Sequence, residues 1–366
     1  MTAQENLMHA TPLPEQHPWP FTSSELTAGL RRHTGDPTLR VLNIEERPVP
    51  QRRPSVGRIR GVHVAARGSS GAYTFHLVLK EPQQSGITLA GSIGPAMREA
   101  AFYRTLAGHL PVRTPQVYAM HPEGEWLLLE CLEDGLQPES WGAAEFLRSV
   151  EQIQVLHDCF WGLGDDLKVY NWLGRPLDAN LDVHQRVAER ATERLLTVAP
   201  DEIQDTPVPW KPLFSRLVAH TAEISAALHT MPDTLLHGDY WPGNIHMDTA
   251  GRLTVYDWQR VSIGPGILDV ISLVQTSRWW FQKLPVDADV LERHYRQGVA
   301  QSSGQVWTDE EWRTLWGYGL LWVFLTHWLS ILGNTPAPLL KTQAPLLQEL
   351  WLQPLAHWLD VFFPEV

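Results

Sequence analysis

The sequence predicts an α+β protein with a small β-rich N-terminal lobe that carries one helix, and a larger, mainly helical C-terminal lobe. Strand-like segments dominate residues 37–80, and helical spacing dominates from residue 141 onward. A chain of 366 residues is long enough for two lobes that each bury a core. We expect an extension at residues 1–36, an N-lobe at 37–132 and a C-lobe at 133–366.

In the N-lobe, alternating and apolar runs bounded by turn residues predict strands at residues 40–49, 61–66, 73–80, 117–119 and 126–132. The segment 67–71 contains two glycines and is typical of a hairpin turn. Residues 96–109 have the spacing of a helix. Residues 1–36 are rich in proline and polar residues, which predicts an extension without a core of its own.

In the C-lobe we expect helices at residues 143–160, 183–198 and 213–229 and from about residue 268 to the end, and short strands at 234–236, 245–247 and 253–256. No Asp, Glu, Lys or Arg occurs between Arg313 and Lys341. The strongly apolar part of that stretch, 320–332, is shorter than the roughly 18–20 residues that span a bilayer. A buried C-terminal helix is therefore expected, and no membrane partner.

Charge and cysteine content restrict the function classes. The formal net charge is −12 and no stripe of basic residues is evident, which disfavours nucleic-acid binding. An acidic surface favours a positively charged substrate. Two cysteines and an N-terminus without a secretory signal predict a cytoplasmic protein.

The segment His-Gly-Asp-Tyr-Trp-Pro-Gly-Asn, residues 237–244, contains the chemistry-bearing residues. Asp239 follows a predicted strand, and Asn244 follows five positions later. The hairpin predicted after Asn244 returns the chain, so Asp257 should lie near Asn244. An amide and a carboxylate are oxygen ligands that suit Mg²⁺, which leaves Asp239 as the carboxylate that faces an acceptor hydroxyl.

This pattern, HGDxxxxN followed by an apolar hairpin and Asp-Trp, resembles the aminoglycoside phosphotransferase and choline kinase family, relatives of the protein kinases. The resemblance implies a protein-kinase-like bilobal fold. It implies that Asp239 is the catalytic base and that Asn244 and Asp257 hold the metal. Asp269, after Gly264-Pro265-Gly266, resembles an aspartate of the family that has a structural role.

The N-lobe adds to the resemblance. Lys80 ends an apolar strand and resembles the family's phosphate-binding lysine, and Glu99 resembles the helix glutamate that pairs with it. The segment 126–132 resembles the hinge strand, whose backbone near Glu130 and Leu132 would hold adenine.

The predicted phosphate loop departs from known patterns. Residues 54–61 contain two glycines and match neither GxxxxGK[ST] nor GxGxxG. The family often has a degenerate loop here, in which a serine and backbone amides contact phosphate, so the resemblance implies this role for Ser55 and Gly57.

Other residues have a structural and a functional interpretation. His237 and His246 could form a metal-binding cluster, but we expect His237 to brace its loop by hydrogen bonds and His157 to be a core histidine. Five aromatic residues could form the walls of an acceptor site: Trp161, Tyr170, Trp172, Trp279 and Trp280. Four acidic residues near them could neutralise ammonium groups of a substrate: Asp158, Asp165, Asp166 and Asp178.

These features together predict a kinase that uses Mg²⁺ and ATP, or GTP, to phosphorylate a hydroxyl of a small molecule. The sequence does not name that acceptor. Three alternatives stay open: a catalytically silent pseudokinase that binds nucleotide, a protein kinase, and a metal-dependent phosphatase. The complete set of Lys80, Glu99, Asp239, Asn244 and Asp257 argues against the silent protein.

Overall fold

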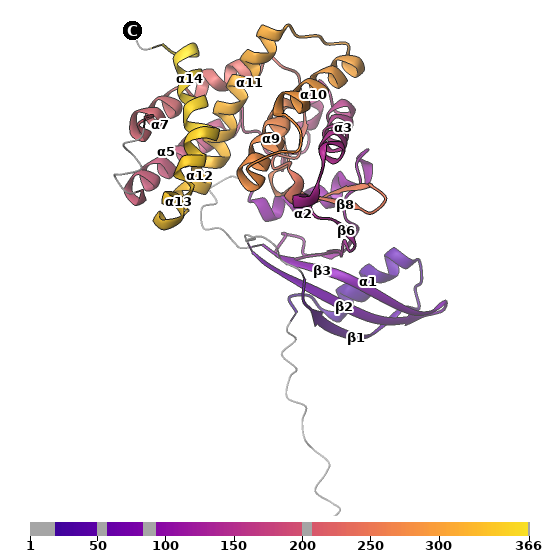
Figure 1. The fold of residues 1–366 in the computed structure, drawn as a ribbon. Helices are drawn as coiled ribbons and strands as arrows, with labels where there is room; N and C mark the ends of the chain where they lie inside the picture. Colours follow the sequence, from indigo (N-terminus) through magenta and orange to yellow (C-terminus); the bar gives the residue numbers. More distant parts are fainter. Residues whose placement is uncertain (1–18, 50–56, 83–92, 200–206, 365–366) are drawn as a thin grey trace, which may run out of the picture. The chain divides into compact units, whose positions relative to one another are not determined.

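The fold is α+β, as the sequence predicts, in a computed structural model that describes residues 19–49, 57–82, 93–199 and 207–364 (Figure 1). The chain divides into two compact units. Unit 1 comprises residues 1–83, 116–121 and 125–131, and unit 2 comprises 84–115, 122–124 and 132–366.

Unit 1 is built on a five-stranded antiparallel sheet. Its strands are β1 (Arg40–Arg47), β2 (Arg58–Gly68), β3 (Gly71–Glu81), β4 (Val117–Met120) and β5 (Leu127–Glu130), in the order β1-β2-β3-β5-β4. Ser69 and Ser70 connect β2 to β3, so the predicted hairpin turn is confirmed. The apolar face of the sheet supplies Val62, Leu77 and Leu128 to a buried core.

The sequence predicted residues 1–36 to be an extension without a core of its own, but part of this segment belongs to the core of unit 1. Thr22 and Glu25 form a capping box that starts helix α1 (Ser23–Thr34). Leu26 and Leu30 of this helix are fully buried in the same cluster as the sheet residues. The proline-rich composition of the first 20 residues led to the prediction of an extension, whereas the helix that follows them packs on the sheet of unit 1.

Unit 2 is mainly helical. Its longer helices are α2 (Pro95–Thr105), α3 (Ala143–Cys159), α5 (Leu181–Val198), α7 (Trp210–Ala219), α8 (Thr221–Leu228), α9 (Ile267–Phe281), α10 (Ala288–Ser303), α11 (Asp309–Val323), α13 (Ala337–Leu347) and α14 (Gln353–Phe362). Short segments are α4 (Gly164–Leu167), α12 (Leu329–Gly333) and the π-helical turns η5 (Phe324–Trp328) and η6 (Gln348–Leu352). Helix α2, which we expected in the N-lobe, belongs to unit 2.

Two small sheets interrupt the helices of unit 2. Strand β7 (Asp233–Leu236) pairs with β10 (Ser262–Pro265), and β6 (Gly135–Leu136), β8 (Ile245–Asp248) and β9 (Leu253–Val255) form the other sheet. The sequence predicted β7, β8 and β9 but not the short strands β6 and β10. The β8–β9 hairpin pairs Ile245 with Val255, which confirms that its two ends lie together.

The apolar C-terminal stretch forms a continuous helical segment, Asp309–Gly333, that is long and apolar enough to cross a membrane. Two thirds of its most apolar window, 67%, is buried inside the protein. Trp322, Phe324 and Trp328 are among its fully or almost fully buried side chains. The segment therefore has the burial of a core helix, as the sequence predicted.

Candidate active site

The loop between β7 and β8 is fixed by Asp269, near the start of α9. This carboxylate is 1% exposed and accepts hydrogen bonds from the backbone N–H groups of His237 at 2.7 Å and Gly238 at 2.8 Å. His157 on α3 lies on the same carboxylate at 3.2 Å, and its other ring nitrogen contacts the hydroxyl of Tyr295 at 2.7 Å. The structural interpretation of His157 is thus confirmed.

His237 braces the loop, as predicted. The backbone N–H of Asp239 donates to its Nδ1 at 3.2 Å, so the ring proton is on Nε2, which donates to the carbonyl of Tyr256 at 2.9 Å. Both ring nitrogens are therefore used, and His237 is not a metal ligand in this arrangement. Its hydrogen bonds tie the segment before Asp239 to the residue before Asp257.

Gly238 is required at its position in the loop. Its φ of +81° lies in the left-handed region, and a Cβ atom there would be 2.3 Å from the carbonyl oxygen of Arg260. Any other residue would push apart the loop and the segment after Asp257.

Asn244, at the end of the loop between β7 and β8, bonds directly to Asp239. Its Nδ2 donates to the carbonyl oxygen of Asp239 at 2.8 Å and to Oδ2 of the same residue at 3.0 Å. Since both acceptors need the amide NH₂ group, the amide oxygen of Asn244 faces away from Asp239. That oxygen is the atom available to a metal.

Asp257 is adjacent to this pair. The N–H of Tyr256 donates to the carbonyl of Asn244 at 3.0 Å, and Asp257 follows with the left-handed dihedral angles φ 66° and ψ 58°. A non-glycine residue in this conformation is uncommon, and such residues cluster at functional sites. The negative charge of Asp257 also helps to raise the pKa of Asp239.

The main cause of the raised pKa of Asp239 is burial, and Arg260 opposes it. Arg260 is itself partly buried; burial lowers its pKa, while the charges of Asp239 and Asp257 counteract that shift. The sequence analysis did not select Arg260. Its position three residues after Asp257 is the signal that could have found it.

Glu99 lies on α2, is fully buried and belongs to the same neighbourhood as Asp257. Burial raises the pKa of the Tyr103 hydroxyl, and the charges of Glu99 and Asp257 both add to that shift. Phe102, beside Tyr103, stacks on Trp258 with ring centroids 4.2 Å apart. This stacking holds α2 against the segment that follows Asp257.

The remaining predicted nucleotide residues lie mostly in unit 1. Lys80 is on β3, opposite Ile59 of β2 and Leu127 of β5, and is 9% exposed. Gly57, directly before β2, has a φ of +118°. Glu130 ends β5, and its N–H donates to the carbonyl of Gln116 at 2.8 Å. Ser55 lies outside the described residues, and Leu132 begins the next part of unit 2.

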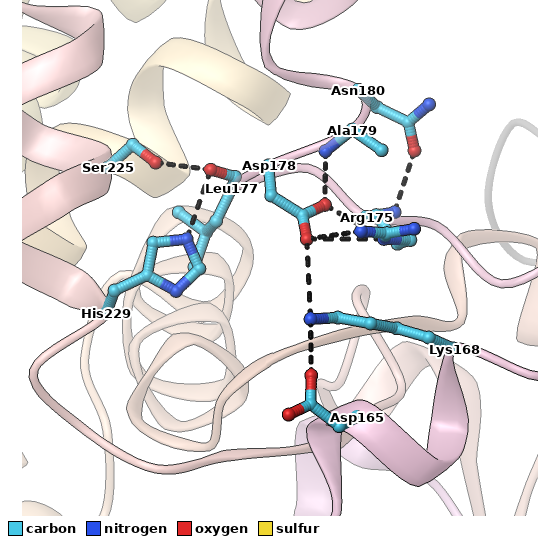
Figure 2. Close-up of polar contacts among 9 residues, drawn as sticks. All are labelled: Asp165, Lys168, Arg175, Leu177, Asp178, Ala179, Asn180, Ser225 and His229. Atoms are coloured by element: carbon cyan, nitrogen blue, oxygen red, sulfur yellow. Dashed lines mark hydrogen bonds and ion pairs between the residues drawn. The ribbon is translucent and has the colours of Figure 1, made fainter.

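Three of the four acidic residues considered for ammonium binding have polar partners in the structure. Figure 2 shows the Lys168 ammonium between Asp165, at 2.6 Å, and Asp178, at 4.0 Å. Arg175 contacts Asp178 at 2.7 Å. Asp158 accepts from the hydroxyl of Ser302 at 2.6 Å. The charges of Asp165 and Asp178 are thus partly compensated within the protein.

The aromatic candidates differ in exposure. Trp172 and Trp279 are each 8% exposed, whereas Trp280 is 45% exposed. Trp280 stacks on Trp241 of the catalytic loop, with ring centroids 6.0 Å apart. Of the five aromatic residues considered, Trp280 therefore contacts the loop that carries Asp239.

Within the described residues, no group of three or more His, Cys, Asp or Glu side chains is placed to hold a metal ion. The arrangement offers one amide oxygen and neighbouring carboxylates instead. Mg²⁺ bound with a nucleotide needs few protein ligands because phosphate oxygens and water supply the rest. The donor set therefore fits a nucleotide-bound Mg²⁺ better than the multi-histidine centre of a metallophosphatase.

A family model described as the phosphotransferase enzyme family matches residues 76–313, which include Lys80, Glu99, Asp239, Asn244 and Asp257. The chain belongs to this family. It is a small-molecule phosphotransferase of the aminoglycoside phosphotransferase and choline kinase type. The family named by the sequence motifs is thus confirmed, and so is the kinase-like fold class.

Solved structures similar to this phosphotransferase include three small-molecule kinases. An ethanolamine kinase of Plasmodium vivax is 12% identical, with 84% of this chain and 83% of that chain covered and a TM-score of 0.51. Macrolide 2'-phosphotransferase MphH of Brachybacterium faecium is 18% identical (84% and 97% covered, TM-score 0.46). Aminoglycoside phosphotransferase APH(3'')-Id of Streptomyces rimosus, solved with ADP and streptomycin, is 18% identical (82% and 98% covered, TM-score 0.43). No curated protein matches the sequence.

Proposed function

We propose that this phosphotransferase moves the γ-phosphoryl group of ATP to a hydroxyl group of a small molecule, with Asp239 as the catalytic carboxylate. The observation that carries the proposal is the grouping of Asp239, Asn244 and Asp257. Phosphoryl transfer depends on positioning and charge stabilisation, and this group supplies both.

Asp239 binds the acceptor hydroxyl and takes its proton as the new O–P bond forms, while the bond between the γ-phosphorus and the β–γ bridging oxygen breaks and ADP leaves. Its Oδ2 is held by Asn244, so Oδ1 is the oxygen available to the acceptor. The raised pKa makes Asp239 a better proton acceptor than an ordinary aspartate once it is ionised. The nearby charge of Arg260 favours the ionised form.

Asn244, through its amide oxygen, and Asp257 would hold Mg²⁺. When bound, the metal would neutralise phosphate charge during transfer. Two protein ligands are enough for a magnesium ion that also binds phosphate oxygens.

The nucleotide-binding roles that the family resemblance implies are part of this proposal. Lys80 would bind the phosphates, Glu99 would position Lys80, and the loop with Ser55 and Gly57 would cover the phosphates. Backbone groups near Glu130 and Leu132 would hold adenine, or guanine if GTP is used. The proposed place of action is the cytoplasm, where ATP is available.

A panel of hydroxylated small molecules tests the proposal and identifies the acceptor class. Consumption of Mg-ATP is measured with neutral sugars, macrolides, amino alcohols and aminoglycosides, using wild-type protein and Asp239→Asn. We expect stimulation by one class in wild-type protein and none in the variant. The proposal fails if no member stimulates consumption or if the variant responds like wild type.

A further inference from the structure

His327 approaches the catalytic carboxylate from a distant part of the sequence. It lies in the π-helical turn η5, and its Nε2 is 3.8 Å from Oδ1 of Asp239. Its Nδ1 is buried and has no hydrogen-bond partner in the part of the chain that the structure describes. Nε2 of the imidazole thus faces the oxygen that would meet the acceptor.

The two oxygens of Asp239 face different groups. Asn244 donates to Oδ2 at 3.0 Å, whereas His327 lies on the Oδ1 side. A distance of 3.8 Å exceeds that of a hydrogen bond, which is about 2.7–3.2 Å between N and O. Contacts of catalytic groups are often long before substrate binds and shorten in the reactive complex.

The surroundings select one protonation form of His327. Burial and the charge of Arg260 lower the pKa of the imidazole well below its usual value, so the ring is neutral at pH 7. A proton on Nδ1 would be a buried donor without a partner and would turn the Nε2 lone pair toward a carboxylate. A proton on Nε2 avoids the unpartnered buried donor, which would cost about 1–3 kcal/mol, and also avoids a lone pair that faces the carboxylate.

Arg260 and His327 act on Asp239 in different ways. Arg260 supplies the positive charge that offsets Asp239 and Asp257, and its Nη2 donates to the carbonyl of Thr326 at 3.3 Å. His327 adds a directed N–H without a second charge. Arg260 thus holds the backbone next to His327 while it compensates the carboxylates.

The π-helical turn accounts for the direction of the side chain. A π-turn contains one more residue than an α-helical turn, and one residue corresponds to about 100° around a helix. Without it, position 327 would face another side of the segment Asp309–Gly333. Turns of this kind occur often at functional sites.

We propose that His327 is a positioning residue of the transfer reaction, whose Nε2–H holds Oδ1 of Asp239 while Asn244 holds Oδ2, so that the plane of the carboxylate is fixed for the acceptor hydroxyl. This inference rests on the proposed function of Asp239.

Two substitutions at His327 separate positioning from structure. His327→Leu removes the donor, and His327→Gln keeps an N–H near the place of Nε2. His294→Leu and His294→Gln are matched controls, because His294 is partly exposed and pairs with Glu151. The measured reaction is hydrolysis of Mg-ATP with water as acceptor, with the unfolding temperature of each variant recorded in parallel.

We expect His327→Leu to lower kcat by roughly ten- to a hundredfold, the effect of a misplaced catalytic group, with the KM for ATP unchanged. His327→Gln should recover most of the loss, and the His294 variants should match wild type. Equal kcat in His327→Leu and wild type, or a glutamine variant as slow as the leucine variant, would overturn the proposal.

Nitrogen NMR of ¹⁵N-histidine-labelled protein tests the contact without catalysis. The His327 signal is the one missing in His327→Gln. We expect the Nε2–H tautomer in wild type and a changed signal in Asp239→Asn; an Nδ1–H tautomer, or no change in that variant, would refute the contact. If Asp239→Asn hydrolyses ATP normally, the proposed role of Asp239 fails, and the NMR result still decides the contact.

Discussion

Asp257 combines an uncommon backbone conformation with a position beside the catalytic loop. Its left-handed dihedral angles follow directly after Tyr256, whose N–H is bound to the carbonyl of Asn244. A side chain held in this way is suited to share a metal with Asn244. Its loss should affect the metal rather than the fold.

Asp257→Ala should therefore remove the magnesium dependence of nucleotide binding. Calorimetry with ADP and with Mg-ADP measures this magnesium dependence. We expect the affinity for Mg-ADP to fall by about tenfold or more, which corresponds to a loss of at least about 1.4 kcal/mol in binding free energy. ADP without metal should bind as in wild type. Asp165→Ala, at an exposed carboxylate paired with Lys168, is the control. A variant that keeps the full magnesium effect would exclude Asp257 as a ligand.

The sequence revealed site residues that are close along the chain and missed those that the fold brings in. Asp239, Asn244 and Asp257 lie within 20 residues and are joined by one hairpin, so their proximity followed from the turn and strand pattern. His327 is far along the chain from Asp239, and only the packing of η5 brings it there. Its one sequence signal was a histidine inside a charge-free apolar helix.

At the scale of elements, α1 shows how a helix becomes part of a sheet unit. A Cβ atom on Gly29 would lie 1.8 Å from the carbonyl oxygen of Tyr118, so the helix rests on the backbone of β4. Leu26 and Leu30 are buried beside it. Such a close approach is possible only without a side chain at position 29.

Gly29→Ala should destabilise unit 1 by about 1–3 kcal/mol, because a backbone contact cannot yield as a flexible side chain can. Gly108→Ala is the matched control, since a Cβ atom there would meet nothing within 4 Å. Chemical denaturation followed by fluorescence compares the two variants. Equal stability of Gly29→Ala and Gly108→Ala would show that α1 does not pack on β4 as described.

Elements were predictable where a pattern was long and local. The strands β2 and β3 and the helices α3 and α5 were expected near their observed positions because each repeats its period over many residues. The strand β10 has four residues and β6 has two, and their pairing partners β7 and β8 are distant in sequence. The sequence contains the capping box of α1, Thr22 and Glu25, but the proline-rich residues before it favoured the prediction of an extension.

For the whole molecule, family membership explains the reaction class and leaves the acceptor open. The matched region, 76–313, contains the residues assigned to catalysis and metal binding, whereas His327 lies beyond it. The carboxylates of Asp165 and Asp178 are occupied by Lys168 and Arg175, so the acidic net charge does not by itself provide an ammonium site there. The acceptor must be identified by measuring phosphoryl transfer to candidate small molecules.

Transfer of label from [γ-³²P]ATP to the acceptor found in the panel is the most direct test of phosphoryl transfer by Asp239. Wild-type protein and the exposed control Asp360→Asn should label the small molecule. Asp239→Asn should lose about 10²- to 10⁴-fold in rate while it still binds nucleotide. Label transfer at the wild-type rate by Asp239→Asn, or label found only in inorganic phosphate or in protein with the wild-type enzyme, would contradict the account.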